Sequence, residues 1–221
     1  MAGMTAPESA PVGPVGRGPL PPDDAGRLDA VRAFFAARAA TWDTRFGEDL
    51  PAYEAAVAEA GFAPGGVVVD IGCGTGRALP ALRAAVGPTG GVVALDVTPQ
   101  MLAEVRTRGR DAAAAPLLAD ATRLPIADGV LAGVFAAGYV SHLPDPVLGL
   151  RELARATRPG GVLALFHPSG RAALAARHHR VLAPDEPLAP GVLGPLLAAS
   201  GWALEVYDDA ADRFYARASR V

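Results

Sequence analysis

The fold is decided by residues 67–76, VVVDIGCGTG, and by the later segment Ala94-Leu95-Asp96. The first apolar run predicts a buried strand, the glycines predict a turn that opens a helix, and the second apolar run predicts a strand that ends in a carboxylate. This order is typical of proteins that bind a nucleoside. The two segments therefore predict an α/β fold with a nucleoside site at the carboxyl ends of its strands.

The glycine spacing narrows the choice of nucleoside. Dinucleotide sites use G-x-G-x-x-G, in which a diphosphate lies on the N-terminus of the following helix. This chain has G-x-G-x-G at Gly72, Gly74 and Gly76, and Arg77 occupies the position of the third fingerprint glycine. The twenty basic residues are all arginine, so a Tyr-x-x-x-Lys pair is missing as well. A nicotinamide-dependent reductase is therefore disfavoured.

S-adenosylmethionine suits this turn better because it carries no phosphate. Its parts are an adenine, a ribose diol, and a methionine tail beside a sulfonium cation. Glycines without Cβ let the backbone approach such a ligand closely. Asp96 can accept both ribose hydroxyls, and Asp70 can attract the ammonium group. We therefore expect S-adenosylmethionine as the cofactor and S-adenosylhomocysteine as its product.

Three predicted strands end in a carboxylate, at Asp70, Asp96 and Asp120. Ligands of an open α/β sheet bind beyond the carboxyl ends of its strands. Carboxylates at adjacent strand ends repel one another unless a cation or a hydroxyl-rich group lies between them. Each acid alone could be a helix cap or a turn residue, but the three together favour a ligand site.

Downstream of the glycine turn, the sequence resembles the class I methyltransferases that use S-adenosylmethionine, most closely their ubiquinone and menaquinone biosynthesis-like branch (methyltransferase type 11). The resemblance covers about residues 34–166. It rests on an ordered series of segments: Leu118-Ala119-Asp120-Ala121, Leu124-Pro125, Asp128-Gly129, His142-Leu143-Pro144-Asp145-Pro146, Arg151-Glu152, Arg155 and Arg158-Pro159-Gly160-Gly161. One departure is Leu131-Ala132, where the family usually has Phe-Asp, so another group must support the core there.

The resemblance implies roles for particular residues. Asp120 would accept a hydrogen bond from the adenine N6 amine, and the backbone N–H of Ala121 would meet N1. Val97 and Met101 would pack on the adenine face. The full set implied for the cofactor is Trp42, Asp70, Gly72, Cys73, Gly74, Gly76, Asp96, Val97, Met101, Asp120, Ala121 and Ala137.

Strands that alternate with helices predict a doubly wound, mostly parallel sheet. We expect strands over 66–71, 92–95, 116–120, 130–137 and 162–166, followed by an antiparallel pair over 202–207 and 213–218. Helices are expected over 75–86, from Thr98 and Pro99 onward, over 146–157, and once or twice within 169–200. Residues 158–161 predict a tight turn. The resemblance implies a Rossmann-like seven-stranded sheet of order 3-2-1-4-5-7-6 with the last strand antiparallel.

A chain of 221 residues fits one such domain. Residues 1–23 are rich in Pro, Gly and Ala and predict a disordered tail, which leaves 24–221 as a single domain. From Asp24, the residues Leu28, Val31, Phe35 and Trp42 recur at helical spacing and predict one amphipathic helix, and 51–60 predict a second helix that Gly61 ends. The resemblance implies that the helical segment 24–61 contributes a lid over the cofactor and substrate.

Composition points to a small-molecule substrate. The net charge of -3 argues against nucleic acid and anionic membranes, which require concentrated positive charge. With Cys73 as the single cysteine, no internal disulfide can form. No secretory segment and no apolar run of membrane-spanning length is present, so we expect a cytoplasmic protein without membrane insertion.

Two histidines are candidates for a general base. His142 follows the fourth predicted strand and His167 the fifth, near the expected position of the methyl group, although either could instead be structural. Phe35, Tyr139 and Arg171 join them as candidate substrate residues. No histidine and acid spacing suggests a metal site, and the acid-rich loop of metal-dependent catechol methyltransferases is missing, so metal independence is expected.

These observations predict an enzyme that transfers a methyl group from S-adenosylmethionine to a small molecule by in-line displacement. Positioning alone can supply much of the acceleration because the cofactor is already activated. A non-catalytic module that only binds the cofactor, or that pairs with an active subunit, is the main alternative. A nicotinamide-dependent reductase is a weaker one.

Overall fold

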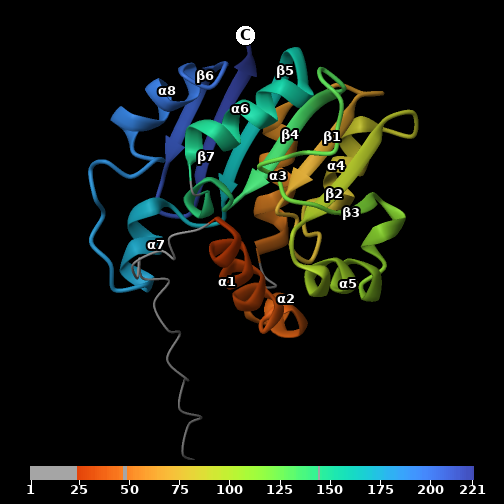
Figure 1. Cartoon of the computed structure of the whole chain (residues 1–221), viewed down its shortest axis with the longest axis horizontal. Helices are drawn as coiled ribbons and strands as arrows, with labels where there is room; N and C mark the ends of the chain where they lie inside the picture. The colour runs from red at the N-terminus through yellow and green to blue at the C-terminus, as the bar shows by residue number, and fades with distance from the viewer. Residues whose placement is uncertain (1–23, 47–48, 144) are drawn as a thin grey trace, which may run out of the picture.

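The computed structural model describes residues 24–46, 49–143 and 145–221, which form a seven-stranded sheet between helices (Figure 1). The strand order is β3-β2-β1-β4-β5-β7-β6, and β7 runs antiparallel to both of its neighbours. The strands are β1 (Val67–Ile71), β2 (Gly91–Asp96), β3 (Ala115–Leu118), β4 (Leu131–Ala137), β5 (Thr157–His167), β6 (Trp202–Asp209) and β7 (Phe214–Arg220). The expected fold class and strand order are confirmed.

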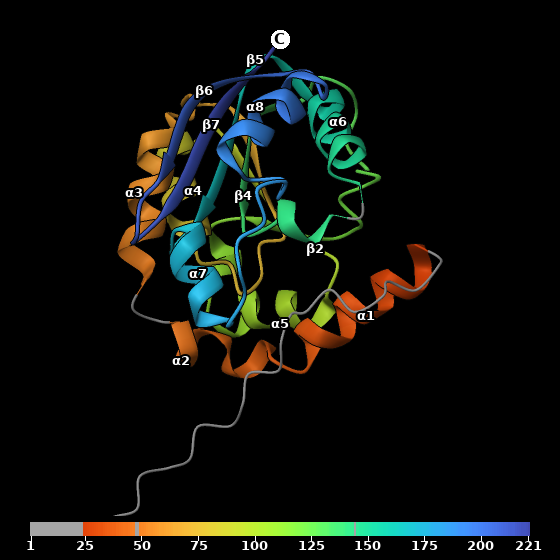
Figure 2. The same cartoon turned by 90° about the vertical axis from the view of Figure 1, so that its left-hand side faces the viewer.

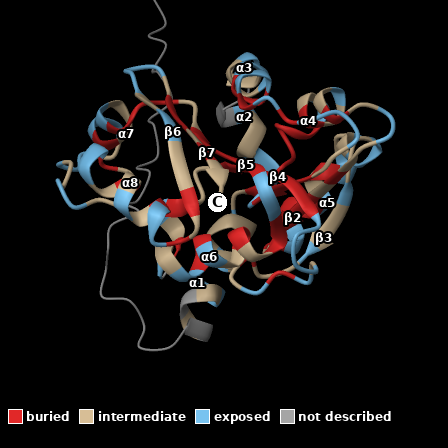
Figure 3. Cartoon of the chain, turned by 90° about the horizontal axis from the view of Figure 1, so that it is seen from above, coloured by how far each residue is buried: buried red, intermediate tan, exposed pale blue. Residues whose placement is uncertain are grey.

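Helices cover the sheet on both faces. They are α3 (Leu50–Ala60), α4 (Leu79–Val86), α5 (Pro99–Thr107), α6 (Pro146–Ala156), α7 (Arg171–Arg177) and α8 (Pro190–Ala198). Side chains of α3, α4 and α5 share one apolar cluster with the sheet, and those of α6 and α8 share the other. Figure 3 shows the buried strands between these two layers. Both faces of the central strands are therefore covered, as apolar parallel strands require.

The helix after the glycine turn begins later than predicted. The prediction placed its start at residue 75, but α4 starts at Leu79. Gly74 and Gly76 have φ of 54° and 83°, in the left-handed region that a right-handed helix cannot contain. The glycine turn is therefore longer than expected and leaves more backbone free of helical hydrogen bonds.

The predicted tight turn at residues 158–161 is wrong, because these residues lie inside β5. Leu131 pairs with Thr157 and Gly133 with Val162, so two residues of β4 stand against five of β5. The excess forms a bulge at the start of the strand. The likewise predicted strand 116–120 ends early, at Leu118, and Asp120 lies in the turn beyond it.

The N-terminal segment is broken into pieces where one helix was expected. It consists of α1 (Asp24–Ala36), the 3-10 turn η1 (Ala39–Thr41) and α2 (Trp42–Phe46). The Arg38 side chain donates to the Phe34 carbonyl at 2.8 Å, which satisfies an acceptor at the end of α1. Figure 1 and Figure 2 place α1 and α2, with α5, at the end of the sheet where the parallel strands finish. The tail predicted over 1–23 lies outside the described residues.

None of the helices in the described part of the chain is long and apolar enough to cross a bilayer.

Candidate functional site

The glycine turn between β1 and α4 has open space beside it. Gly72, Gly74 and Gly76 all adopt positive φ. A Cβ on Gly76 would lie 2.6 Å from Cδ1 of Leu79, so this glycine is required by packing. A Cβ on Gly74 would meet nothing within 4 Å. The turn can therefore receive a ligand against the backbone at Gly74.

Asp96, the last residue of β2, holds this turn in place. Its Oδ2 accepts the Gly74 N–H at 2.9 Å and its Oδ1 accepts the Thr98 N–H at 2.7 Å. Burial raises the pKa of Asp96, while the backbone N–H groups of Thr98 and Gly74 oppose that rise. Each carboxylate oxygen accepts up to two hydrogen bonds, so both oxygens can still accept a ligand hydroxyl.

Asp70, in β1, is a buried acid without a partner. Its side chain makes no hydrogen bond or ion pair with any residue the structure describes, and the residue is 2 % exposed. Burial, and then the neighbouring Asp96 carboxylate, raise the pKa of Asp70 well above its usual value. An unpaired buried carboxylate is costly, and a cation beside it would remove that cost. The site is therefore suited to a ligand that brings a positive group.

Tyr139 carries a second unsatisfied group. A Cβ on Gly72 would lie 3.7 Å from Cδ2 of Tyr139, so this ring borders the glycine turn. The Tyr139 hydroxyl is buried and has no hydrogen-bond partner among the described residues. Burial raises the pKa of Tyr139, and the nearby Asp120 carboxylate raises it further. A ligand beside Gly72 could supply the missing partner.

The remaining residues predicted for the cofactor lie around the same edge of the sheet. Asp120 accepts hydrogen bonds from Thr122 N and Oγ1, both at 2.8 Å. Cys73 is buried, and its N–H donates to the Leu95 carbonyl at 2.9 Å. Burial raises the pKa of the Cys73 thiol, so the group is a neutral filler in the turn. Met101 and Ala121 are buried, whereas Val97 and Ala137 are half-buried.

Asp43 of α2 was not among the site residues predicted from the sequence. Its carboxylate contacts Thr75 Oγ1 at 2.5 Å, Arg110 Nη1 at 2.8 Å, and the Nε atoms of Arg77 and Arg108, each at 3.3 Å. Burial opposes ionisation, but the Thr75 hydroxyl and the arginines bring the pKa of Asp43 below its usual value. This cluster ties the N-terminal segment to the glycine turn.

Arg77 could have revealed this cluster. It replaces the third fingerprint glycine, and its side chain is 4 % exposed. A buried guanidinium requires carboxylate partners. Asp43 supplies one, and Asp49 supplies another at 2.6 Å from Arg77 Nη1. The sequence does not say which acids these are, because both lie more than twenty residues away.

Aromatic rings of the N-terminal segment lie against a histidine that follows β4. The Phe35 ring lies 5.6 Å from those of Trp42 and His142, measured between centroids. His167, at the end of β5, is half-buried. The structure thus brings the N-terminal segment against His142, and the substrate roles of Phe35, Tyr139, His142 and His167 stay predictions.

Arg171 is engaged in structural contacts. Its guanidinium pairs with Asp209 at 3.4 Å and with Glu186 at 3.3 Å, and its backbone N–H donates to Asp209 Oδ1 at 2.8 Å. These contacts hold α7 against the end of β6. Two carboxylates already balance the charge of Arg171, so its position in the fold does not require a substrate anion, and its role in gripping a substrate stays a prediction.

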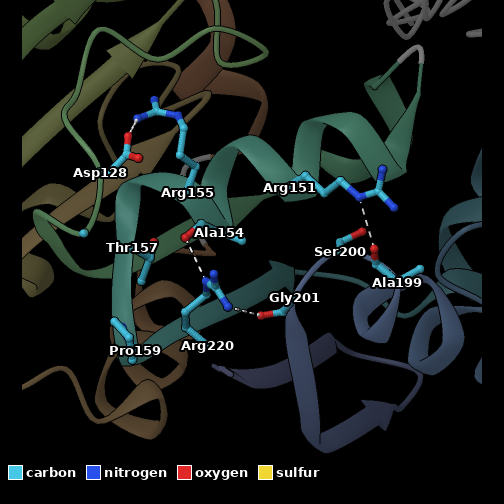
Figure 4. Close-up of a pocket in the computed structure, with 11 residues that line it drawn as sticks. Asp128, Arg151, Ala154, Arg155, Thr157, Pro159, Ala199, Ser200, Gly201 and Arg220 are labelled. Carbon is cyan, nitrogen blue, oxygen red and sulfur yellow. Dashed lines mark hydrogen bonds and ion pairs between the residues drawn. The ribbon is translucent and has the colours of Figure 1, made fainter.

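A cavity of about 620 Å³ lies at the opposite edge of the sheet, where β5 begins and β7 ends (Figure 4). Its arginines bind backbone carbonyls. Arg151 Nε donates to Ala199 at 3.1 Å, and Arg220 Nε donates to Ala154 at 2.9 Å. Such contacts satisfy the free carbonyls at the C-terminal ends of α6 and α8. Helix capping therefore explains these arginines, and the cavity lies away from the glycine turn.

Among the described residues, no group of three or more His, Cys, Asp or Glu side chains is arranged to hold a metal ion. The expected metal independence stays a prediction.

Part of the chain is similar in sequence to known methyltransferases. Residues 69–165 match the family model described as a methyltransferase domain. The chain is 36% identical over 107 residues to the ubiquinone/menaquinone biosynthesis C-methyltransferase UbiE of Burkholderia mallei, covering 48% of this chain and 44% of that protein. It is 35% identical over 106 residues to an uncharacterized 37.1 kDa protein in transposon TN4556 of Streptomyces fradiae, covering 48% of this chain and 31% of that protein. The chain thus spans less than half the length of these relatives.

Solved structures share the fold. A SAM-dependent methyltransferase from Aquifex aeolicus superposes with a TM-score of 0.63 at 24% identity, over 76% of this chain and 89% of that one. The DhpI-SAH complex superposes with a TM-score of 0.68 at 21% identity, over 90% of this chain and 98% of that one. At these identities the likeness is one of fold.

Proposed function

We propose that this chain, whose residues 69–165 match the methyltransferase domain model, transfers a methyl group from S-adenosylmethionine to a small-molecule acceptor. The observation that carries the proposal is the unpaired Asp70 carboxylate, buried beside Asp96 at the glycine turn. A dinucleotide would add negative charge at this point. S-adenosylmethionine would instead bring an ammonium group and a sulfonium, both positive.

The residues fit each part of this cofactor. Asp70 would pair with the ammonium group, and Asp96 would accept the two ribose hydroxyls with the acceptor positions that Gly74 and Thr98 leave free. Asp120 and the Ala121 N–H would bind the adenine edge, beside Val97 and Met101. The Tyr139 hydroxyl, which lacks a partner, would gain one from the ligand. Gly72, Cys73 and Gly76 would shape the turn, with Ala137 and Trp42 at its border.

The protein's own contribution to the reaction is mainly positioning. When bound, the cofactor supplies an activated methyl group, so little additional chemistry is required. Asp70 and Asp96 would fix the methyl donor at the strand ends, while Phe35 and His142 would border the acceptor. Holding two reactants in line without intervening water can contribute several kcal/mol, roughly 7–11 at best. Segment 24–46, tied down by Asp43, would limit water access.

Transfer of a labelled methyl group tests this proposal. The purified chain is incubated with S-adenosylmethionine carrying a radioactive methyl group and an extract of small metabolites. We expect label in a small organic product. The Asp96→Ala variant is the control and should give less of that product. Binding of the cofactor without any labelled product would favour the non-catalytic module instead.

A thermal-shift comparison tests the reductase alternative. S-adenosylhomocysteine should raise the melting temperature, and NADPH should not, because Arg77 replaces the glycine that a diphosphate requires. Stabilisation by NADPH alone would overturn the cofactor assignment.

A further inference from the structure

The ring of His167 lies beside the proposed methyl-transfer site. His167 is the last residue of β5, and a Cβ on Gly138 would lie 3.7 Å from its Cδ2. Gly138 precedes Tyr139, whose ring borders Gly72 of the glycine turn. The chain of contacts from the glycine turn to His167 is therefore short and continuous. Because β4 and β5 are adjacent, paired strands, this placement is rigid.

A backbone carbonyl fixes the tautomer of this histidine. His167 Nδ1 lies 3.0 Å from the Ser169 carbonyl oxygen. A carbonyl only accepts hydrogen bonds, so Nδ1 must carry the proton. In the neutral ring, Nε2 is then the atom with the free lone pair. No residue in the described ranges hydrogen-bonds to Nε2, and Cδ2, which is bonded to Nε2, is the atom that faces Gly138.

The surroundings keep this ring neutral. Burial lowers the pKa of His167, and the positive charges of Arg177, His142 and His178 lower it further, against the raising effect of the Ser169 carbonyl. The other charged groups of α7 and β6 close to this strand end, Arg171 and Asp209, pair with each other. With a pKa below the usual value of about 6.5, the ring is neutral at about pH 7 and can accept a proton.

We propose that His167 is the general base of the reaction and that the methyl acceptor is a hydroxyl group, of the phenol or enol type. The inference rests on the proposed function. Nε2 takes the hydroxyl proton as an oxygen lone pair forms the bond to the methyl carbon. The bond from that carbon to sulfur breaks, its electron pair stays on sulfur, and the sulfonium charge disappears. The imidazolium then returns its proton to water.

The two candidate histidines differ in their surroundings. His142 lies in the turn η4 (Val140–His142) and packs its ring edge-on against Phe35 of α1. His167 lies on a strand end, with Nδ1 bound to the Ser169 carbonyl and with no hydrogen bond to Nε2 from any described residue. A base requires this second arrangement. The ring of His142 is instead a wall of the acceptor site, and with Phe35 and Trp42 it offers aromatic faces for a phenol ring.

The tautomer can be measured without knowing the natural acceptor. The chain holds four histidines, so 15N-histidine spectra of the full chain with S-adenosylhomocysteine can be assigned by single variants. We expect His167 to be neutral at about pH 7, with its proton on Nδ1 and a free lone pair on Nε2. A proton on Nε2, or a charged ring at that pH, would overturn the proposal. If S-adenosylhomocysteine does not bind at all, it is the proposed function that fails.

Two phenols test the chemistry. At about pH 8, 4-nitrophenol is mostly ionised and does not need a base, whereas 4-methylphenol resembles a tyrosine side chain and does. His167→Gln should slow methylation of 4-methylphenol roughly 100-fold and that of 4-nitrophenol by less than about threefold. His178→Gln, the same substitution on a neighbouring ring, should leave the ratio of the two rates unchanged. An equal loss for both phenols would make His167 structural, and methylation of neither phenol by the cofactor-bound wild type would contradict the hydroxyl acceptor.

Discussion

Two halves of the same sheet edge differ in charge. The ends of β1 and β2 and the turn after β3 carry Asp70, Asp96 and Asp120, whereas the ends of β4 and β5 lead into Tyr139 and His167. The first half complements a cationic methyl donor. The second half has aromatic rings and the proposed base His167, which would suit a protic acceptor. If the proposed function holds, donor and acceptor would be recognised by opposite chemistry, on either side of the line along which the methyl group moves.

The halves are also built differently. The acidic half is held by backbone contacts, since Asp96 binds two backbone N–H groups and Cys73 binds Leu95. The acceptor half depends on side chains of the separate segment 24–46, which Asp43 fixes to the glycine turn. Each of the following substitutions acts on one half or on the contact between them.

The largest effect on stability is expected at the contact between the halves. Asp43→Ala removes a carboxylate, 12 % exposed, from three arginines, and leaves the buried Arg77 with less compensation. Breaking a buried ion pair from one side costs about 3 kcal/mol or more, so the free energy of unfolding should fall by about that amount. Urea denaturation measures it.

Glu59→Ala is the matched control, because Glu59 pairs with Arg213 while both side chains are about one third exposed. Its cost should be at most about 1 kcal/mol. If the two variants lose the same stability, the Asp43 cluster does not hold segment 24–46 in place.

The next effect concerns the acidic half alone. Asp70→Asn keeps the shape of the side chain and removes its charge, so affinity for S-adenosylhomocysteine should fall roughly 10- to 100-fold, as expected for a charged hydrogen bond of about 1.5–3 kcal/mol. Without ligand, the same variant should unfold at a higher temperature, because it no longer buries an unpaired carboxylate beside Asp96. A variant that binds normally would remove Asp70 from the cofactor site.

The stability difference between the wild type and Asp70→Asn should depend on pH. The folded-state pKa of Asp70 is raised, so its carboxyl contributes stability that is fully present below the unfolded value of about 4 and is lost as the pH rises through the folded value. Asp70→Asn should therefore gain stability over the wild type only as the pH rises above about 4. Thermal melts of both proteins across this range measure the difference, and parallel curves would contradict it.

The smallest effect is expected at Tyr139, whose ring borders Gly72 of the glycine turn. Tyr139→Phe removes a buried hydroxyl that has no partner among the described residues, so the ligand-free protein should become more stable by about 1 kcal/mol. If the ligand supplies the missing partner, affinity for S-adenosylhomocysteine should fall severalfold in the same variant. Melting and calorimetry check the two parts, and a loss of ligand-free stability would show that the hydroxyl is already satisfied.

The sequence predicted the strands that carry the acids better than it predicted the N-terminal segment, for a physical reason. Short-range constraints determine the glycine turn and the strand ends, since Gly76 must adopt φ of 83° beside Leu79 and Asp96 follows its own strand. Periodicity could not reveal that residues 158–161 form a bulge, because the bulge depends on pairing with β4. It also could not reveal that α1 ends at Ala36, because α1 and the following turn η1 pack against α5, far along the chain. Nor could it pair Asp43 with Thr75, which is a contact between segments far apart in the chain.

Calorimetric titration of S-adenosylhomocysteine into the wild type and into Asp96→Ala tests the central claim most directly. Asp96 holds the glycine turn through Gly74 and would bind both ribose hydroxyls. We expect the wild type to bind one equivalent and the variant to lose at least about 100-fold in affinity, or about 2.7 kcal/mol. Equal affinity in the two proteins, with both folded, would contradict a cofactor site at the acidic strand ends.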